Sequence, residues 1–299
     1  MGEHQNQSNA SKNQTIRHLL KVTNDFFASQ GIDSPRLDAE VLMAHVLKME
    51  RLQLYVEMDK PLNETEINLY RDVVRRRRAK EPVAYITGQR EFYGLDFSVD
   101  PSVLIPRPDT ETLVELALER LPAEQEGTVI DVGTGSGCIA AAIAHHRPRL
   151  NVIATDLSED ALSVASENIK QLGLQGRVSL RQGNLLEPVH DCQDVVAIVS
   201  NPPYIQKDMA DTLMKDVVQF EPSLALFGMG EDGLEHHRHL LTHSLRLLAE
   251  DGFLMMEFGF GQDPLVRQLS HDGFAEPKIY ADLGGIPRVV SYERYSVSS

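Results

Sequence analysis

The sequence predicts an α/β protein with a doubly wound, mostly parallel seven-stranded sheet, a small N-terminal helical domain and a β-hairpin linker. Three observations carry this prediction. Residues 15–81 repeat apolar positions at helical spacing. Residues 82–108 change to short alternating runs punctuated by Gly and Pro. Residues 109–299 alternate strand-like and helix-like patterns, which is typical of a parallel sheet whose strands are joined by crossover helices.

The N-terminal part is expected to be a helical substrate-recognition domain behind a disordered tail. Residues 1–14 are polar and rich in Asn, Gln and Ser, which predicts the tail. One helix follows and stops at Gly31, a second opens at Pro35, and a third covers 62–80. The third carries Arg75, Arg76, Arg77 and Arg78, which form either a solvated helix face or a docking patch for an acidic partner surface.

The α/β part, residues 109–299, is expected to bind its ligand outside the carboxyl ends of its parallel strands. The predicted strands are 128–132, 151–155, 178–182, 195–200, 252–258, 277–280 and 288–295. The predicted helices are 109–121, 138–146, 159–172, 233–250 and 263–270.

Composition and charge narrow the class of protein. Two cysteines in 299 residues are too few for a disulfide scaffold and indicate a reducing, cytoplasmic environment. Neither a signal peptide nor a run of about 18 apolar residues is present, so we expect no membrane span. Residues 101–299 hold 15 Lys and Arg against 29 Asp and Glu. Because such an acidic body repels phosphate backbones, we expect no direct nucleic-acid substrate.

A glycine-rich loop follows the first strand of the α/β part, in the pattern Asp131-x-Gly-x-Gly-x-Gly. Alternate glycines let the backbone turn tightly and approach a ligand closely. The dinucleotide fingerprint does not fit because Cys138 takes the place of its third glycine, and no Gly-Lys-Ser/Thr of a P-loop follows. The pattern resembles the S-adenosylmethionine loop of class I methyltransferases; another nucleotide site or a plain tight turn is the alternative. The expected cofactor-binding residues here are Gly133, Thr134, Gly135, Ser136 and Gly137.

Polar residues after the next two strands are further cofactor candidates. Asp156 could accept hydrogen bonds from the ribose hydroxyls, or stand idle while Ser158 caps the following helix. Asn184 and Leu185 follow the third strand. Class I methyltransferases often carry an acid at this place for the adenine amino group; the Asn184 oxygen can accept the same bond, or the residue is a plain loop Asn.

Asn201-Pro202-Pro203-Tyr204 follows the fourth strand and is the candidate catalytic and substrate-binding turn. The two prolines exclude regular hydrogen bonding and fix the directions of their neighbours. The Asn201 side-chain oxygen and the Pro202 carbonyl can hold the two N–H groups of a planar nitrogen, and Tyr204 can stack on its plane. Asn201 would also contact the cofactor. The alternative is a rigid turn that merely ends the strand.

This turn resembles that of amino methyltransferases, and further blocks resemble the peptide chain release factor glutamine methyltransferase family. These blocks are residues 81–88, 91–94, 104–111 and 282–290. The resemblance covers residues 15–295 and implies transfer of a methyl group from S-adenosylmethionine to the side-chain nitrogen N5 of the glutamine in the Gly-Gly-Gln motif of bacterial class I release factors. The rivals are an adenine-N6 methyltransferase acting on DNA or RNA and a non-catalytic cofactor-binding adaptor.

Three other features are candidate sites. His236, His237, His239 and His243 lack a metal-binding motif, so we expect no metal. Cys138 precedes an apolar run, so burial is expected rather than catalysis. Residues 106–108 are expected either to form a lid over the cofactor, with Phe97 and Ile105 packed nearby, or to leave Arg107 paired with a local carboxylate. We expect the chain to be a monomer.

Overall fold

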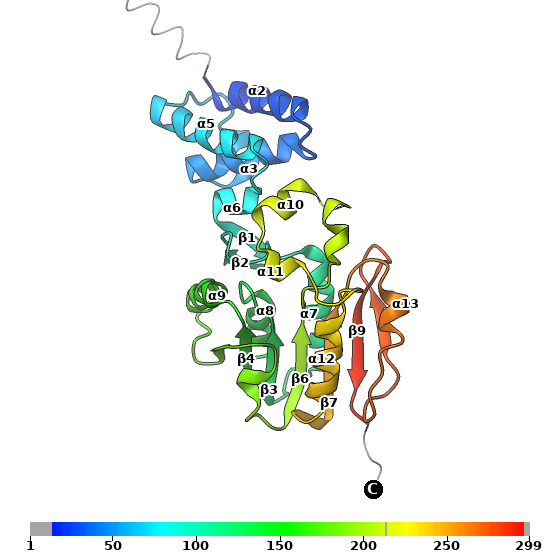
Figure 1. Cartoon of the computed structure of the whole chain (residues 1–299). Coiled ribbons are helices and arrows are strands. Elements are labelled where there is room, and N and C mark those ends of the chain that lie inside the picture. Colours follow the sequence, from blue (N-terminus) through cyan, green and yellow to red (C-terminus); the bar gives the residue numbers. More distant parts are fainter. Residues whose placement is uncertain (1–13, 213, 296–299) are drawn as a thin grey trace, which may run out of the picture. The chain divides into compact units, whose positions relative to one another are not determined.

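The computed structural model describes residues 14–212 and 214–295 and separates into two compact units, with the division after Gly88 (Figure 1). Apart from Gln14, the predicted N-terminal tail lies outside the described residues. Within the described residues no helix combines the length and apolar character needed to cross a membrane.

The first unit is helical, as predicted. Its elements are α2 (Ile16–Ser29), α3 (Pro35–Leu47), α4 (Arg51–Val56), α5 (Glu64–Arg78) and α6 (Val83–Thr87). Side-chain caps close several helix starts: Thr15 accepts the N–H of His18, and Asn63 forms a reciprocal capping box with Glu66. Their inward faces share one hydrophobic core that includes Phe27, and the short α4 and α6 were not predicted.

The second unit begins with the hairpin β1 (Gln89–Phe92) and β2 (Leu95–Ser98). The hairpin was predicted within residues 82–108 and is found there. The start of that segment is instead the helix α6, so the expectation of hairpin and linker was wrong for Val83–Thr87. Pro82 starts this helix and Gly88, in the left-handed conformation, ends it. Both residues suggested a loop from sequence because each is also a turn former.

The predicted seven-stranded sheet is confirmed. Its strands are β3 (Gly127–Val132), β4 (Leu150–Asp156), β5 (Val178–Gln182), β6 (Val195–Ser200), β7 (Leu248–Glu257), β8 (Lys278–Ala281) and β9 (Pro287–Glu293). Their order is β5-β4-β3-β6-β7-β9-β8, and only the pairs that involve β9 are antiparallel. The chain leaves β3 for β4 on one side and β6 lies on the other, which places the topological switch point at the end of β3.

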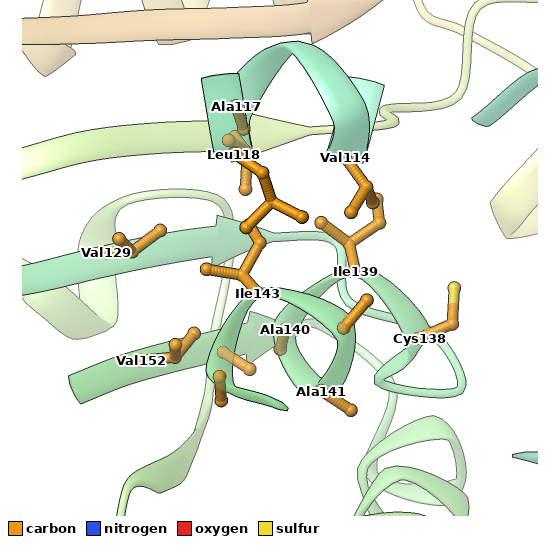
Figure 2. Packing of buried hydrophobic residues seen from close by; sticks show 14 of the residues in the cluster. Val114, Ala117, Leu118, Val129, Cys138, Ile139, Ala140, Ala141, Ile143 and Val152 are labelled. Atoms are coloured by element: carbon orange, nitrogen blue, oxygen red, sulfur yellow. The ribbon is translucent and has the colours of Figure 1, made fainter. Parts of the chain in front are cut away.

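Helices cover both faces of this sheet. Helices α7 (Glu111–Arg120), α8 (Cys138–His146) and α9 (Glu159–Gln171) pack on the face that carries Val129, and Figure 2 shows Leu118, Ile139 and Ile143 meeting there. Helix α12 (Glu235–Ser244) packs on the face that carries Ile130. Alternate residues of β3 thus serve two cores, as expected of a strand buried on both sides.

Two helix predictions were too long. The helix predicted over 233–250 is α12, which ends at Ser244, and β7 begins at Leu248 before Gly252. The helix predicted over 263–270 is α13, Asp263–Val266. Apolar residues such as Leu247 and Leu248 continue the helical pattern, although they are buried in the core through a turn and a strand. After the Asn-Pro-Pro-Tyr turn lie η3 (Lys207–Thr212), α10 (Lys215–Phe220) and α11 (Ser223–Leu226).

Candidate active site

A cavity opens at the carboxyl ends of β3 to β6 and gathers most of the predicted site residues. Those that line it are Gly133, Thr134, Gly135, Ser136, Asp156, Asn184, Leu185, Asn201 and Pro203. Gly137 does not line it: this glycine starts α8 at φ +80°, and a Cβ there would lie 3.2 Å from Ala165. Its role is therefore close packing of the loop against α9.

The glycine loop is held by the backbone of the neighbouring strand. The N–H groups of Gly133 and Thr134 both donate to the Thr155 carbonyl at 2.9 Å. Gly133 and Gly135 have φ of +72° and +54°, and a Cβ on either would meet no atom within 4 Å. The loop thus keeps open space beside its backbone, as an elongated ligand requires.

Asp131, at the base of the loop, is completely buried. Its Oδ2 accepts the Thr134 hydroxyl at 2.6 Å and the Ala140 N–H at 3.1 Å, which fixes the loop to the first turn of α8. Burial raises the pKa of Asp131 to about 7, against the opposing effect of these hydrogen bonds.

Asp156 ends β4 and faces the cavity. Its Oδ2 accepts the Gly135 N–H and its Oδ1 accepts the Ser158 N–H, both at 2.9 Å. Ser158 caps α9 by accepting the Ala161 N–H. Asp156 therefore makes hydrogen bonds of its own while Ser158 caps the helix, and it is not idle. Desolvation raises the pKa of Asp156. Each carboxylate oxygen keeps a lone pair for a further donor, and a ribose diol offers two.

Asn184 and Leu185 sit on a sharp bend after β5. Gly183 has φ +154° and Leu185 has φ +48°, and the Leu185 carbonyl accepts the Thr155 hydroxyl at 3.1 Å. Leu157, Ala161 and Leu185 add apolar surface to the cavity beside the Asn184 amide. An adenine ring needs this combination of apolar walls and one polar edge.

The Asn201 side chain is anchored by its amino end. Asn201 Nδ2 donates to Thr110 Oγ1 at 3.1 Å, and Asn201 Oδ1 accepts no hydrogen bond within the described part of the chain. Since Asn201 lines the cavity and is only half-buried, its oxygen remains available to a ligand.

Pro202 and Tyr204 lie behind the cavity wall rather than in it. Pro202 is buried, and the Tyr204 hydroxyl donates to Glu257 Oε1 at 3.1 Å. The Tyr204 carbonyl accepts Gln262 Nε2 at 3.0 Å. A Cβ on Gly259 would lie 2.9 Å from the Tyr204 ring, so this glycine permits the ring to pack closely. The turn is consequently fixed at several points.

Two segments over the cavity are joined by an ion pair. Arg107 donates to Glu221 Oε1 at 2.5 Å, while Glu221 Oε2 accepts the Ile105 N–H at 3.2 Å. Glu221 is buried, and the adjoining Pro106 and Pro222 both line the cavity. The carboxylate partner of Arg107 is therefore 114 residues away rather than local. Phe97 is buried beside Phe92 in the hydrophobic core instead.

Among the other sequence candidates, Cys138 and His236 line the cavity and His237 is buried. Cys138 is buried, which raises the pKa of its thiol to about 12. His237 is buried too, bonds the Glu257 carbonyl at 2.8 Å, and has its pKa lowered to about 4 by desolvation. His236 contacts the Pro203 carbonyl. Among the residues with described positions, no group of three or more His, Cys, Asp or Glu is arranged to hold a metal ion.

The arginine run on α5 is mostly engaged within its own unit. Arg77 pairs with Asp38 at 2.7 Å and both side chains are nearly buried. Arg76 pairs with Glu81, and Arg78 lies over the Phe26 ring. Within the described residues, the ion pair of Arg75 is with the exposed Asp72. The run is thus neither a uniformly solvated face nor a free basic patch.

Sequence reasoning missed the residues that support the site from behind, above all Thr110, Glu221 and Glu257. Thr110 ends the short 3-10 helix η1 (Pro108–Thr110), Glu221 directly follows α10, and Glu257 ends β7. A charged residue directly after the apolar run 253–256 is the local signal that could have found Glu257.

Comparison with protein families matches both units. Residues 18–88 match the PrmC N-terminal domain, and residues 108–224 match the methyltransferase small domain. The release factor glutamine methyltransferase of Geobacter sulfurreducens is 43% identical over 92% of this chain and 95% of its own. The proteins of the same name from Rhodopirellula baltica and Moorella thermoacetica are each 40% identical over 94% of this chain, and over 96% and 99% of their own.

Solved structures show the same fold at low sequence identity. The hMettl16 catalytic domain matches 73% of this chain and 82% of its own, with a TM-score of 0.54 at 18% identity. A methyltransferase from Pyrococcus furiosus matches 68% of this chain and 91% of its own, with a TM-score of 0.51 at 18% identity.

Proposed function

The chain belongs to the release factor glutamine methyltransferase family, and on this premise we propose that it methylates the Gly-Gly-Gln glutamine of bacterial class I release factors through Asn201 and its neighbours. The cofactor is S-adenosylmethionine, whose sulfonium supplies an activated methyl group when bound. The observation that carries the residue assignment is that the free oxygen of Asn201 and the glycine loop belong to one cavity.

The cavity supplies complementary groups for each part of this cofactor. Asp156 has lone pairs left for the ribose hydroxyls, and Leu157, Leu185 and Asn184 suit the adenine ring. The open backbone at Gly133 and Gly135 suits the methionine part. We assign cofactor binding to these residues together with Thr134 and Ser136, and we leave Gly137 to loop packing.

The substrate is held by hydrogen-bond acceptors rather than activated by a base. A carboxamide nitrogen carries two N–H groups, and Asn201 Oδ1 and the Pro202 carbonyl would accept one each. These two hydrogen bonds orient the nitrogen and stabilise the positive charge that develops on it as the nitrogen–carbon bond forms and the sulfur–methyl bond breaks. The methylated nitrogen then releases one proton to solvent. Orientation of the two reactants is worth about 7–11 kcal/mol in well-placed systems, which is ample without a nucleophilic side chain. Tyr204 would hold the turn in place from behind the cavity wall, through the bond of its hydroxyl to Glu257.

The class of substrate and the place of the reaction follow from the family and from the net charge of residues 101–299. Residues 101–299 hold 15 basic and 29 acidic side chains, which disfavours a nucleic-acid backbone as ligand. We therefore take the protein, and not DNA or RNA, as the direct substrate, and we take the first unit as its recognition domain. We also propose a cytoplasmic monomer, since termination of translation takes place there.

The test compares methyl acceptors. Purified protein is incubated with labelled S-adenosylmethionine and a release factor, the same factor with its Gly-Gly-Gln glutamine changed to Ala, or DNA. Label should enter only the intact factor. Asn201→Ala should abolish transfer while the cofactor dissociation constant and melting temperature change little. Label on the altered factor at the same level, on DNA alone, or full activity of Asn201→Ala would each reject the proposal.

A further inference from the structure

Two buried residues, Thr110 and Glu257, bond the Asn201 and Tyr204 side chains of the Asn-Pro-Pro-Tyr turn, and Thr110 also lines the cavity. Thr110 is 3% exposed and ends the turn η1 (Pro108–Thr110), and Glu257 is 1% exposed and ends β7. Thr110 receives the bond from Asn201, and Glu257 receives the bond from Tyr204. Thr110 belongs to the block 104–111 and Glu257 to none of the blocks named above, and the sequence assigned neither residue a role, so their burial beside the site requires a reason.

The direction of the Thr110 hydroxyl decides which end of Asn201 faces the cavity. A hydroxyl has one proton to donate and lone pairs with which to accept. If that proton points at a carboxylate, the Thr110 oxygen can act toward Asn201 only as an acceptor. Asn201 must then turn its amino group toward Thr110. The observed 3.1 Å bond from Asn201 Nδ2 to Thr110 Oγ1 has this sense. Asn201 Oδ1 consequently points away from Thr110.

Glu257 is the carboxylate that can set this direction. Its Oε1 accepts the Tyr204 hydroxyl, while its Oε2 is buried without a hydrogen bond of normal geometry to any described residue. The Thr110 hydroxyl acts toward this carboxyl as a donor and lowers its pKa, against the larger opposing effect of burial. A buried carboxylate oxygen is costly to leave unpaired, so the Thr110 proton is drawn toward it.

The same carboxylate fixes Tyr204. Burial and the neighbouring Glu257 raise the pKa of Tyr204, which keeps the phenol protonated and therefore the donor of the pair. Arg288 favours the ionised form of Glu257, whereas burial and Asp109 oppose it, and Arg288 itself pairs with Asp109 at 2.9 Å. Glu257 thus bonds Tyr204 of the turn and lies opposite Val289 of the block 282–290 in the pairing of β7 with β9.

We propose that Glu257 and Thr110 are positioning residues for methyl transfer: the carboxylate orients the Thr110 hydroxyl, and the hydroxyl holds Asn201 with its oxygen toward the substrate amide. This inference rests on the role proposed above for Asn201. An Asn201 turned by half a rotation would present N–H groups to the N–H groups of the substrate. That arrangement removes an acceptor at the place where positive charge develops.

Matched variants of Thr110 test this arrangement of Glu257, Thr110 and Asn201, which we call the relay. Thr110→Val keeps the shape and loses the hydroxyl, whereas Thr110→Ser keeps the hydroxyl. Thr110→Val should lower kcat on the release factor by about tenfold to a hundredfold, the range for a hydrogen bond to a charged network. The cofactor dissociation constant should stay within about twofold, and Thr110→Ser should recover most of kcat. Thr242→Val, on the exposed part of α12 where the hydroxyl bonds its own helix, controls for the substitution itself.

A pH profile gives a second readout if Thr110→Val folds poorly. Glu257→Gln removes the titrating group, and its amino group can donate to Thr110 and so turn the relay around. Wild-type kcat should rise with pH as Glu257 ionises, and the Glu257→Gln variant should be slow and flat. Burial raises the pKa of Glu257 to about 7, so the rise falls within a usable range.

The outcomes separate this inference from the proposed function. If Asn201→Ala abolishes methylation while Thr110→Val keeps wild-type kcat, the relay is refuted and the function stands. The relay is refuted as well if Thr110→Ser is as slow as Thr110→Val, or if Glu257→Gln keeps the wild-type pH profile. If wild-type protein labels no release factor at all, the proposed function fails first.

Discussion

The Asn168 side chain donates to the Ser136 carbonyl at 2.9 Å and so ties helix α9 to the glycine loop. The same amide group donates to the Ser98 carbonyl at 3.0 Å and accepts the Ser98 N–H at 2.7 Å. Asn168 is 0% exposed. One buried amide therefore satisfies the end of the hairpin and the cofactor loop together, and neither can shift without leaving a buried polar group unpaired.

Replacing Asn168 by Ala should destabilise the protein and weaken cofactor binding. The change leaves the Ser98 N–H and the Ser136 carbonyl without partners, at about 1–3 kcal/mol for each buried group. We expect a loss of roughly 2–4 kcal/mol in urea unfolding and a higher S-adenosylmethionine dissociation constant by calorimetry. Gln171→Ala is the control, because the Gln171 bond to the Ser98 hydroxyl is exposed. Equal effects of the two variants would show that the buried amide does not position the loop.

The parts of the fold that sequence predicted well are those governed by local rules. In β3, which contains Asp131, and in the loop from Gly133 to Gly137, three signals follow one another closely. They are a hydrophobic run, a turn that needs glycine and the start of a helix. Each of these is decided within a few residues. The same holds for the Asn201 turn, where two prolines leave the backbone little freedom.

The parts that sequence could not predict depend on contacts between distant segments. Glu221 binds Arg107 across 114 residues, and Thr110 binds Asn201 across 91. No local pattern encodes such pairs in one sequence. The end of α12 was predicted wrongly for a related reason. The apolar periodicity continues past Ser244, but α12 ends there because Leu248 is buried in the core as part of a strand. The placement of Tyr204 behind the cavity wall likewise depends on Glu257, which follows it by 53 residues.

Two arginines of the same run should differ sharply in their effect on stability. Arg77→Ala removes the partner of Asp38, whose side chain is only 11% exposed, and so leaves a nearly buried charge unpaired. Such a change costs about 2–4 kcal/mol. Arg75→Ala breaks an exposed pair with Asp72 and should cost less than about 0.5 kcal/mol. Thermal melting of the two variants checks this, and similar melting temperatures would contradict the structural role of Arg77.

Asp131 should make the protein less stable as pH rises. Burial raises its pKa in the folded protein to about 7, whereas the unfolded chain has the ordinary value of about 3.9. Between these values the folded state keeps a proton that the unfolded state has released. The free energy of unfolding therefore falls with increasing pH across this window and levels off above it.

The contribution of Asp131 is measured as a difference because other groups titrate nearby. His237, with a folded pKa of about 4, makes stability rise with pH up to about 6.5, and Glu257 acts in the same sense as Asp131. Both are present in the Asp131→Asn variant, whose Oδ1 can still accept from Thr134 and Ala140. Urea unfolding should show the variant gaining about 2–3 kcal/mol relative to wild type between pH 5 and pH 8. Parallel stability curves for the two proteins would mean that Asp131 does not hold its proton in the folded loop.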